Sequence, residues 1–335
     1  MSDAPQPVRP PMACDKNALR IDCEAESDRI ADAIRRQVRQ IRRKGVVLGM
    51  SGGIDSSVTA ALAVRSLGPK RVVGICMPES DSDPKSLALG RLVAERYGIR
   101  CIVEDIAPTL SALRCYERRN EAVAQVVPGF TPDWKFKLVL PGPHHQGLNF
   151  FSVVARSPDG REVRERLPLD AYLAIVAATN FKQRVRKMVE YYWADRLNYA
   201  VAGTPNRLEY DQGFFVKQGD GAADLKPIAH LYKTQVYALA AHLGVPDEIR
   251  RRPPSTDTYS LPQGQDEFYF RLPHDKMDLC LFARNRGIGA AEVAQAAGLT
   301  TDQVEQAFKD IDTKRSSTRY QHLAPFLVDD IPGVG

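Results

Sequence analysis

Short apolar strands alternate with helices from residue 24 onward, and this alternation limits the folds that the chain can adopt. Residues 46–50 and 71–77 have the composition of buried strands, and a helical segment over 56–67 connects them. A strand, a helix and a strand in this order form a parallel sheet with right-handed crossovers and helices on both faces. The sequence therefore predicts an α/β fold, a doubly wound and Rossmann-like parallel sheet.

The remaining periodic segments extend this pattern. Apolar residues at 30, 34, 38 and 41 follow helical spacing and predict a helix over 24–44, which Gly45 ends. Further helices are expected over 84–97, 180–197 and 231–243, and further strands over 100–106 and 199–203. Ligands of such sheets bind beyond the carboxyl ends of the strands, so functional residues are expected just after each strand.

One long segment, residues 107–178, does not follow the alternation and is rich in aromatic residues and proline. Within it, residues 149–155 and 162–167 flank a Ser-Pro-Asp-Gly turn and predict a hairpin. Residues 134–140 alternate apolar and basic side chains and predict a third strand. We therefore expect a β-rich subdomain inserted into a single domain that spans 24–335.

Composition excludes several classes of protein. Apolar residues make up 44% and charged residues 26%, with a mean hydropathy of -0.31, which is ordinary for a globular chain. No stretch approaches the roughly 18 uncharged apolar residues of a membrane span. Residues 1–23 begin with a Pro-rich stretch, lack the order of a secretory signal and are predicted to be a disordered lead-in. Six cysteines without a Cys-x-x-Cys pair favour a reduced, cytoplasmic setting.

The most specific motif is the segment Ser51-Gly52-Gly53-Ile54-Asp55-Ser56-Ser57, which follows a predicted strand and opens a predicted helix. Glycines there let backbone N–H groups approach a phosphate, and the helix N-terminus adds a partial positive charge. A flexible turn is the simpler alternative, but the flanking strand and helix favour a phosphate site. Neither a Walker A motif nor a Gly-x-Gly-x-x-Gly motif is present, so a dinucleotide-dependent dehydrogenase is not expected.

This Ser-Gly-Gly-x-Asp-Ser segment resembles the pyrophosphate loop of the ATP pyrophosphatase group. Those enzymes cleave ATP to AMP and pyrophosphate and activate a carboxylate or carbonyl as an adenylate. The resemblance implies that Asp55 holds Mg²⁺, a hard cation that prefers carboxylate and phosphate oxygens.

Downstream segments resemble those of the NAD synthetase family, in the same order. The matching segments are residues 180–186 (Asn-x-Lys-x-Arg-x-Arg), 203–209 (Gly-Thr-x-Asn-x-x-Glu), 217–224 (Lys-x-Gly-Asp-Gly-x-x-Asp), Pro254-Ser255 with 265–267 in place of a second ATP loop, and Lys314-Arg315. The resemblance runs from about residue 24 to residue 320 apart from the predicted insert.

The family resemblance implies a reaction. The nicotinate carboxylate of deamido-NAD attacks the α-phosphorus of ATP, giving an NAD-adenylate and pyrophosphate, and ammonia then displaces AMP. A carboxylate cannot be amidated directly because its oxygen is a poor leaving group, and adenylation removes that obstacle. The site must neutralise charge at a transferring nucleotidyl group, so cations are expected to dominate it.

The resemblance also implies individual roles. Asp55 and Lys233 are the expected catalytic residues, and Asp55 and Glu209 the expected Mg²⁺ ligands. The expected ATP-binding residues are Gly49, Met50, Ser51, Gly52, Gly53, Ile54, Asp55, Ser56, Thr204, Lys233 and Ser255. The expected deamido-NAD-binding residues are Arg184, Lys217, Asp224 and Lys314. Each has a simpler alternative, such as a helix cap for Asp224 or a surface ion pair for Arg184.

The sequence departs from the family pattern in four places. Thr313 stands where the family often has His, and Thr256-Asp257 adds a charge after Ser255. The insert is longer than in typical bacterial relatives. No glutaminase segment is present, so free ammonia or a separate glutaminase subunit is the expected nitrogen source. The family is homodimeric, and aromatic residues among the arginines of the 180–197 helix suit such an interface.

Three other functions are weighed against this one. An amidating adenylyl-transferase could act on a different carboxylate, with the insert reshaping the acceptor pocket. An RNA-modifying enzyme could use the same loop, but the net charge of +5 and the unpaired cysteines argue against a nucleic-acid partner. Retention of Asp55, Glu209 and Lys233 argues against a non-catalytic remnant. The insert is expected to extend the subunit interface or border the acceptor site, with a merely decorative hairpin as the alternative.

Overall fold

Four parallel strands form the central sheet of the computed structural model, which describes residues 15, 17–140, 151–255 and 258–333. The strands are β1 (Val46–Gly49), β2 (Val72–Cys76), β3 (Arg100–Val103) and β7 (Ala200–Val201), in the order β3-β2-β1-β7. In register, Val46 of β1 faces Val72 of β2 on one side and Ala200 of β7 on the other. The doubly wound parallel sheet that the sequence predicts is therefore confirmed.

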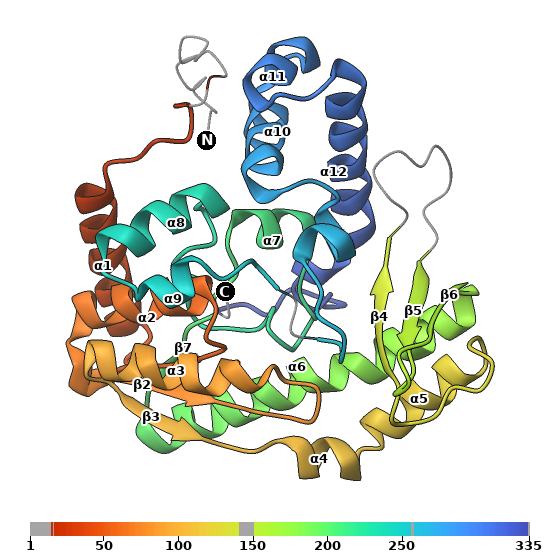
Figure 1. Cartoon of the computed structure of the whole chain (residues 1–335). Coiled ribbons are helices and arrows are strands. Elements are labelled where there is room, and N and C mark those ends of the chain that lie inside the picture. Colours follow the sequence, from red (N-terminus) through yellow and green to blue (C-terminus); the bar gives the residue numbers. More distant parts are fainter. Residues whose placement is uncertain (1–14, 16, 141–150, 256–257, 334–335) are drawn as a thin grey trace.

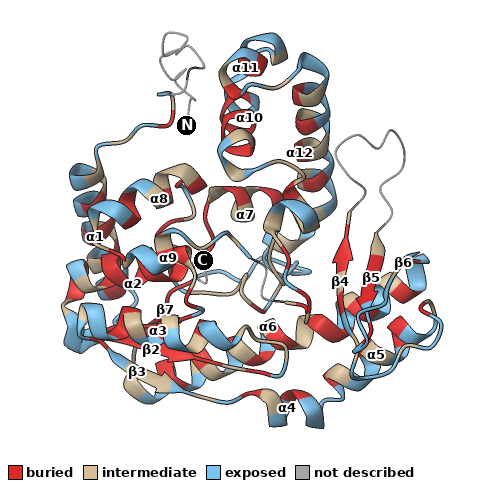
Figure 2. Ribbon diagram, viewed as in Figure 1, coloured by how far each residue is buried: buried red, intermediate tan, exposed pale blue. Residues whose placement is uncertain are grey.

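Helices cover both faces of this sheet (Figure 1). One face carries α1 (Cys23–Gln40), α2 (Ile54–Leu67), α3 (Pro84–Tyr97) and α8 (Lys233–His242), and a short 3₁₀ turn, η1 (Pro69–Arg71), precedes β2. The other face carries α4 (Ala107–Ala112) and α6 (Leu169–Leu197). The side chains of successive strand residues point to opposite faces of the sheet. Val46 and Leu48 pack against the helices of the first face, and Val47 packs against α4 and α6 on the other. Figure 2 shows the resulting buried layers on either side of the strands.

The predicted insert folds as a helix and a small antiparallel sheet. Helix α5 (Cys115–Ala124) is followed by β4 (Lys135–Val139), β5 (Ser152–Arg156) and β6 (Glu162–Arg166), in the order β4-β5-β6. Gly160 takes φ +89° in the predicted turn, and its N–H donates to the carbonyl of Ser157 at 3.0 Å. The predicted hairpin and third strand are confirmed within the described residues; the start of the 149–155 strand lies outside them.

A second group of helices follows the sheet domain. It comprises α7 (Arg207–Gln212), the π-helical turn η2 (Asp266–Phe270), α10 (His274–Arg286), α11 (Ala290–Ala297) and α12 (Thr301–His322). The short helix α9 (Asp247–Arg250) instead packs on the sheet domain through Ile249. Buried residues of α7 and α10–α12 form their own apolar cluster. Leu19, near the end of the predicted lead-in, is buried in this cluster, so that part of the segment is ordered; residues 1–14 and 16 lie outside the described residues.

Several element boundaries differ from the sequence-based expectation. Helix α6 begins at Leu169, well before the predicted start at Asn180, because the end of the predicted insert continues the helix. Strand β7 has only two residues, and a single bridge from Ala202 to Leu225 extends it. Helix α1 ends at Gln40, since Arg42 adopts φ +55° and breaks the helical path. Among the helices of the described ranges, none combines the length and apolar character needed to cross a bilayer.

The apolar residues at 30, 34, 38 and 41 allow a test of which of them contribute to the hydrophobic core. Ile34 is 1% exposed, whereas Ile41, one residue beyond the helix, is 42% exposed. We expect Ile34→Ala to lower the free energy of unfolding by about 3 kcal/mol, because it removes buried methyl groups and leaves a cavity. Ile41→Ala, the matched control, should change it by less than about 0.5 kcal/mol. Urea unfolding of both variants measures the difference, and equal losses would show that Ile41 also lies in the core.

Candidate active site

The loop between β1 and α2 is shaped for an anion. Gly52 has φ +72°, and a Cβ there would lie 2.7 Å from both the Cβ of Leu89 and the backbone oxygen of Ser86. Only glycine fits this close approach to α3 without strain. Gly53 is the N-cap of α2 and makes no side-chain capping bond, so the first N–H groups of α2 remain available to a ligand.

Serine hydroxyls hold this loop from within. The Ser51 hydroxyl accepts from the Gly53 N–H at 3.2 Å and lies 3.2 Å from the Ser56 hydroxyl. Ser56 and Ser57 donate to the Gly53 carbonyl at 3.0 and 2.8 Å. The loop is therefore preformed, which favours anion binding because little backbone has to be ordered.

A cavity of 1180 Å³ opens beyond the carboxyl ends of β1 and β2. This volume exceeds that of a typical single-ligand pocket, roughly 300–1,000 Å³, and suits two nucleotide substrates. The lining includes the expected ATP-binding residues Gly49, Met50, Ser51, Gly53, Ile54, Asp55, Ser56, Thr204, Lys233 and Ser255, and also Met77 and Pro78 after β2. Gly52 packs against α3 behind the loop and is not part of the lining.

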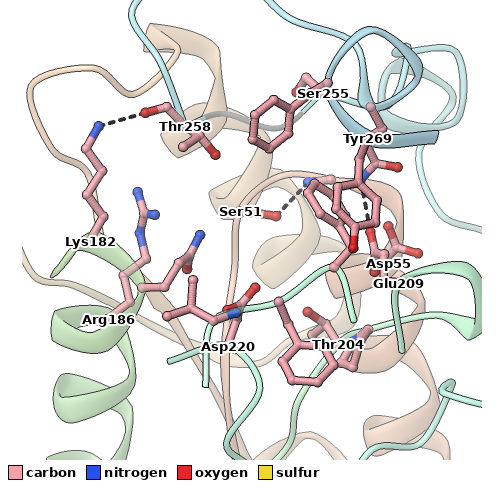
Figure 3. A pocket seen from close by; sticks show the side chains of 18 of the residues that line it. Ser51, Asp55, Lys182, Arg186, Thr204, Glu209, Asp220, Ser255, Thr258 and Tyr269 are labelled. Atoms are coloured by element: carbon pink, nitrogen blue, oxygen red, sulfur yellow. Dashed lines mark hydrogen bonds between the residues drawn. The ribbon is translucent and has the colours of Figure 1, made fainter. Parts of the chain in front are cut away.

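Four polar residues from three elements meet at one side of this cavity. The Lys233 ammonium, 2% exposed, pairs with the Asp55 carboxylate. Asn206 donates to the other Asp55 oxygen at 3.0 Å, and its own N–H donates to Glu209 at 3.1 Å. Figure 3 shows Asp55 and Glu209 beside each other, although they come from α2 and α7. The structure thus brings together the three charged residues that the sequence predicts to act on ATP.

Burial and charge control ionisation in this group. Burial, and then the Asp55 charge, raise the pKa of Glu209 to about 7. Burial alone would lower the pKa of Lys233, but Asp55 and Glu209 more than offset it, so the pKa is raised and the ammonium stays charged. Two close carboxylates beside one lysine form a site that a divalent cation would stabilise.

A buried carboxylate from another helix fixes the position of Lys233. Asp278 of α10 accepts the N–H groups of Lys233 and Thr234 at 3.2 and 2.7 Å, at the start of α8. Burial raises the pKa of Asp278 to about 7. The backbone of the expected catalytic lysine is therefore anchored outside the sheet domain.

Three of the four residues expected to bind deamido-NAD line the cavity. Arg184 donates to the carbonyl of Lys217 at 3.3 Å, and the Lys217 ammonium donates to the carbonyl of Tyr320 at 2.8 Å. Lys314 pairs with Asp310, and burial lowers its pKa. Asp224 is placed elsewhere: its exposed side chain accepts the N–H of Val201 at 2.7 Å at the edge of the sheet. A contact from Asp224 to the dinucleotide stays a prediction.

Sequence reasoning missed a set of charged residues on α6. Lys182, Arg186 and Lys187 line the cavity together with Glu190, and Lys187 pairs with Glu190 at 2.7 Å. Helical spacing could have found the pair 182 and 186, which lie one turn apart on one face. Of the family departures, Thr313 lines the cavity and donates to the carbonyl of Lys309 at 2.8 Å. Thr256 and Asp257 lie outside the described residues.

Fold and site together define a class of α/β protein with a large cavity beyond the carboxyl ends of its strands, a Ser-Gly-Gly loop that lines it, and a carboxylate pair beside a buried lysine. The family model for NAD synthase matches residues 26–128 and 164–322 and leaves out the middle of the insert. The chain therefore belongs to the NAD synthase family.

Curated relatives support this assignment over nearly the whole chain. The NH(3)-dependent NAD(+) synthetase of Rhizobium meliloti is 59% identical over 94% of this chain and 95% of its own length. The protein of the same name from Methanocaldococcus jannaschii is 31% identical over 84% of this chain and 89% of its own.

Solved structures show the same fold. The NH3-dependent NAD synthetase from Campylobacter jejuni superposes with a TM-score of 0.60, at 20% identity, over 92% of this chain and all of that one. The glutamine-dependent NAD+ synthetase from Acinetobacter baumannii gives a TM-score of 0.51 at 19% identity, and this chain spans only 47% of it.

Gly52 and Gly298, two of the glycines with positive φ, give a matched test of the loop. Gly52→Ala should weaken ATP binding about tenfold or more, because it combines strain of roughly 1–3 kcal/mol with an overlap that displaces the loop. Gly298 has φ +61° and open space around it, so Gly298→Ala carries the strain without the overlap. Titration calorimetry with ATP should show normal affinity for the Gly298 variant. Normal affinity in the Gly52 variant would contradict the assignment of this loop.

Proposed function

We propose that this chain catalyses the ATP-dependent amidation of deamido-NAD to NAD, with ammonia as the nitrogen donor and AMP and pyrophosphate as the other products. It is thus a ligase of NAD biosynthesis that forms a C–N bond. The observation that carries this proposal is the Ser-Gly-Gly loop with Asp55, Glu209 and Lys233 around it, in a chain 59% identical to an NH(3)-dependent NAD(+) synthetase.

The first step needs charge neutralisation at the α-phosphate. The carboxylate of deamido-NAD attacks the α-phosphorus, pyrophosphate leaves, and negative charge grows on the leaving oxygens. The N–H groups at the start of α2 and the buried Lys233 ammonium are positive groups held in fixed positions at the loop, and they require no reorganisation during the reaction. In the second step ammonia attacks the acyl carbon and AMP leaves.

The donor set fits a magnesium ion. Asp55 and Glu209 offer carboxylate oxygens, and burial and the Asp55 charge raise the pKa of Glu209, a repulsion that a divalent cation would relieve. Within the described ranges, no group of three His, Cys, Asp or Glu side chains forms a protein-only cage. Mg²⁺ commonly uses one or two carboxylates and completes its shell with phosphate and water. When bound, it would neutralise the phosphate charge as a Lewis acid.

Deamido-NAD is proposed to bind along α6 and α12, where Arg184, Lys217 and Lys314 line the cavity. Their present partners are mainly carbonyl groups, so a dinucleotide phosphate offers stronger, charge-assisted bonds. Free ammonia or a separate glutaminase subunit remains the proposed nitrogen source, and the cytoplasmic location stays a prediction.

The function is tested with the purified chain, ATP, Mg²⁺ and ammonium. With deamido-NAD, equal amounts of AMP and NAD should form. Nicotinate mononucleotide in place of deamido-NAD tests for a different carboxylate acceptor, and glutamine in place of ammonium tests the nitrogen source. No NAD from deamido-NAD, with product from the mononucleotide, would overturn the proposed acceptor.

Removal of either carboxylate should strongly slow the reaction. Asp55→Asn and Glu209→Gln each remove a proposed Mg²⁺ ligand, so we expect turnover to fall about 100-fold or more, equivalent to about 3 kcal/mol. Glu305→Gln, on an exposed position of α12, is the control and should keep normal turnover. Steady-state rates at saturating Mg²⁺ measure the effect. Near-normal turnover in either variant would remove that residue from the metal site.

The apparent affinity for Mg²⁺ should depend on pH. Glu209, with its pKa raised to about 7, holds a proton below that pH, and the metal must displace it. We expect the Mg²⁺ concentration for half-maximal rate to rise about tenfold per pH unit below 7 and to level off above 8. Glu209→Gln should abolish this dependence. A Mg²⁺ requirement that is flat from pH 6 to pH 8 would contradict the role of Glu209.

A homodimer through α6 is also proposed. Trp193, one of the aromatic residues of the 180–197 pattern, is buried within the chain, as is its neighbour on α6, Val185. Met188 and Tyr192, one turn apart, are instead 60% and 56% exposed, and Leu173 further along α6 is 53% exposed. Exposed apolar groups in a line along one helix suit a C2 contact.

The proposed dimer is tested by introducing one charged side chain among these exposed apolar residues of α6. We expect sedimentation to show a dimer at micromolar concentration, and Met188→Asp to weaken it at least about tenfold because an unpaired charge is buried at the interface. Ile41→Asp, on an exposed apolar residue after α1, is the control and should leave the dimer intact. A wild-type protein that sediments only as a monomer would contradict the proposal.

A further inference from the structure

Strand β4 of the insert has one edge that its own sheet does not use. The sheet order β4-β5-β6 leaves β4 at the margin, and an exposed edge strand must be covered or paired. Here residues 258–267, which we call the docked loop, cover it. The docked loop runs into the turn η2 and includes its first two residues, Asp266 and Glu267.

Backbone and side-chain bonds attach the docked loop along the whole of β4. The N–H of Phe136 donates to the Ser260 hydroxyl at 3.0 Å, and the Phe136 carbonyl accepts the Leu261 N–H at 3.1 Å. Gln263 donates to the carbonyl of Leu138. The loop therefore occupies the place of a further, irregular strand.

Two more bonds, one from Lys137 within β4 and one from Leu140 just after it, reach Glu267. The N–H of Leu140 donates to the carbonyl of Glu267 at 3.2 Å, and the ammonium of Lys137 pairs with the Glu267 carboxylate at 2.6 Å. Aromatic packing adds to them: Tyr259, 5% exposed, lies with its ring centre 5.6 Å from that of Phe136. The contact is thus both hydrogen-bonded and apolar.

A buried ionic network fixes the start of the docked loop. Lys182 of α6 donates to the carbonyl of Thr258 at 2.8 Å, as Figure 3 shows, and to the carboxylate of Asp81 at 2.6 Å. Arg119 of α5 pairs with the same Asp81, and its guanidinium lies 5.1 Å above the Phe136 ring. Lys182 also reaches Glu79 at 3.0 Å. This network links α5, the segment after β2 and the docked loop.

The other side of the docked loop faces the proposed ATP site. Thr258, Tyr259 and Gln265 line the cavity, and Gln265 donates to the Glu209 carboxylate at 2.9 Å. The segment after β2 also lines the cavity, through Met77 and Pro78. The insert therefore contacts, from behind, two segments that shape the nucleotide site.

We propose that the insert is a brace that holds the docked loop in place before ATP binds, with Arg119 and Lys137 as its positioning residues. This inference rests on the proposed function. A loop that is already ordered adds no ordering cost to ATP binding, so the brace acts on ATP affinity rather than on the chemical step. The sequence analysis expects the insert to serve the interface or the acceptor; the contacts of β4 favour the ATP side.

The first test is hydrogen exchange on the ligand-free protein. The Leu261 N–H should exchange slowly, at a rate close to those of β4 itself, because it donates to the Phe136 carbonyl. Exchange at the rate of an unstructured peptide would overturn the brace. This measurement needs no substrate, so it stands even if the proposed reaction fails.

The second test separates ATP affinity from turnover. Arg119→Met keeps the packing on Phe136 but removes the pair with Asp81, and it should raise the KM for ATP about tenfold, with kcat and the KM for deamido-NAD changed less than about twofold. Arg119→Lys should restore much of the ATP affinity. Lys137→Met, a milder change at a partly exposed pair, should raise the KM for ATP about threefold. Both Met variants should also speed exchange of the docked loop.

Matched controls lie on the same insert. Arg156→Met removes an exposed pair with Glu162 between β5 and β6, and Lys135→Met changes the residue two positions before Lys137 on the same face of β4. Both control variants should leave the KM for ATP and the hydrogen-exchange rates of the docked loop unchanged. If Arg119→Met fails to fold, Lys137→Met decides the question. An increase in the KM for deamido-NAD instead of ATP would assign the insert to the acceptor site and refute the brace.

Discussion

The pairing of the Lys233 ammonium with the Asp55 carboxylate is the interaction on which the site depends. A buried ammonium without a partner would cost several kcal/mol, so Asp55 is needed to keep Lys233 charged inside the protein. Glu209 lies close enough for the Asp55 charge to raise its pKa. The three residues come from different elements, so the complete group can form only when α2, α7 and α8 have all packed.

The sequence predicted the sheet domain well because its signals are local and periodic. Helix α3 has the predicted bounds, since Pro84 starts it and Gly98, in the left-handed conformation, ends it. Strand β7 is shorter than expected because its apolar residues continue as a loop after one bridge to Leu225. The start of α6 was misplaced because residues 169–179 read as the end of an irregular insert.

The sequence predicted which residues meet in the cavity where they lie at motif positions, and it missed residues that only tertiary packing brings there. Asp55, Glu209 and Lys233 lie at motif positions and meet in the cavity. Lys182 and Arg186 also lie in a quoted motif, but only the orientation of α6 shows that they face the cavity. Asp278 has no motif at all: its role depends on how α10 meets the start of α8. No local pattern encodes a contact between helices more than forty residues apart.

The bond from Asp278 to the start of α8 has a consequence for how this chain tolerates variation. Lys233 belongs to the sheet domain by its neighbours, but its backbone is held by α10, which belongs to the apolar cluster of α10–α12. Damage to that cluster would therefore reach the site without any change in the site residues. The same bond makes α10 a poor place for a domain boundary, a circular permutation or a tag insertion, since a shift of this helix would move the lysine away from the Ser-Gly-Gly loop.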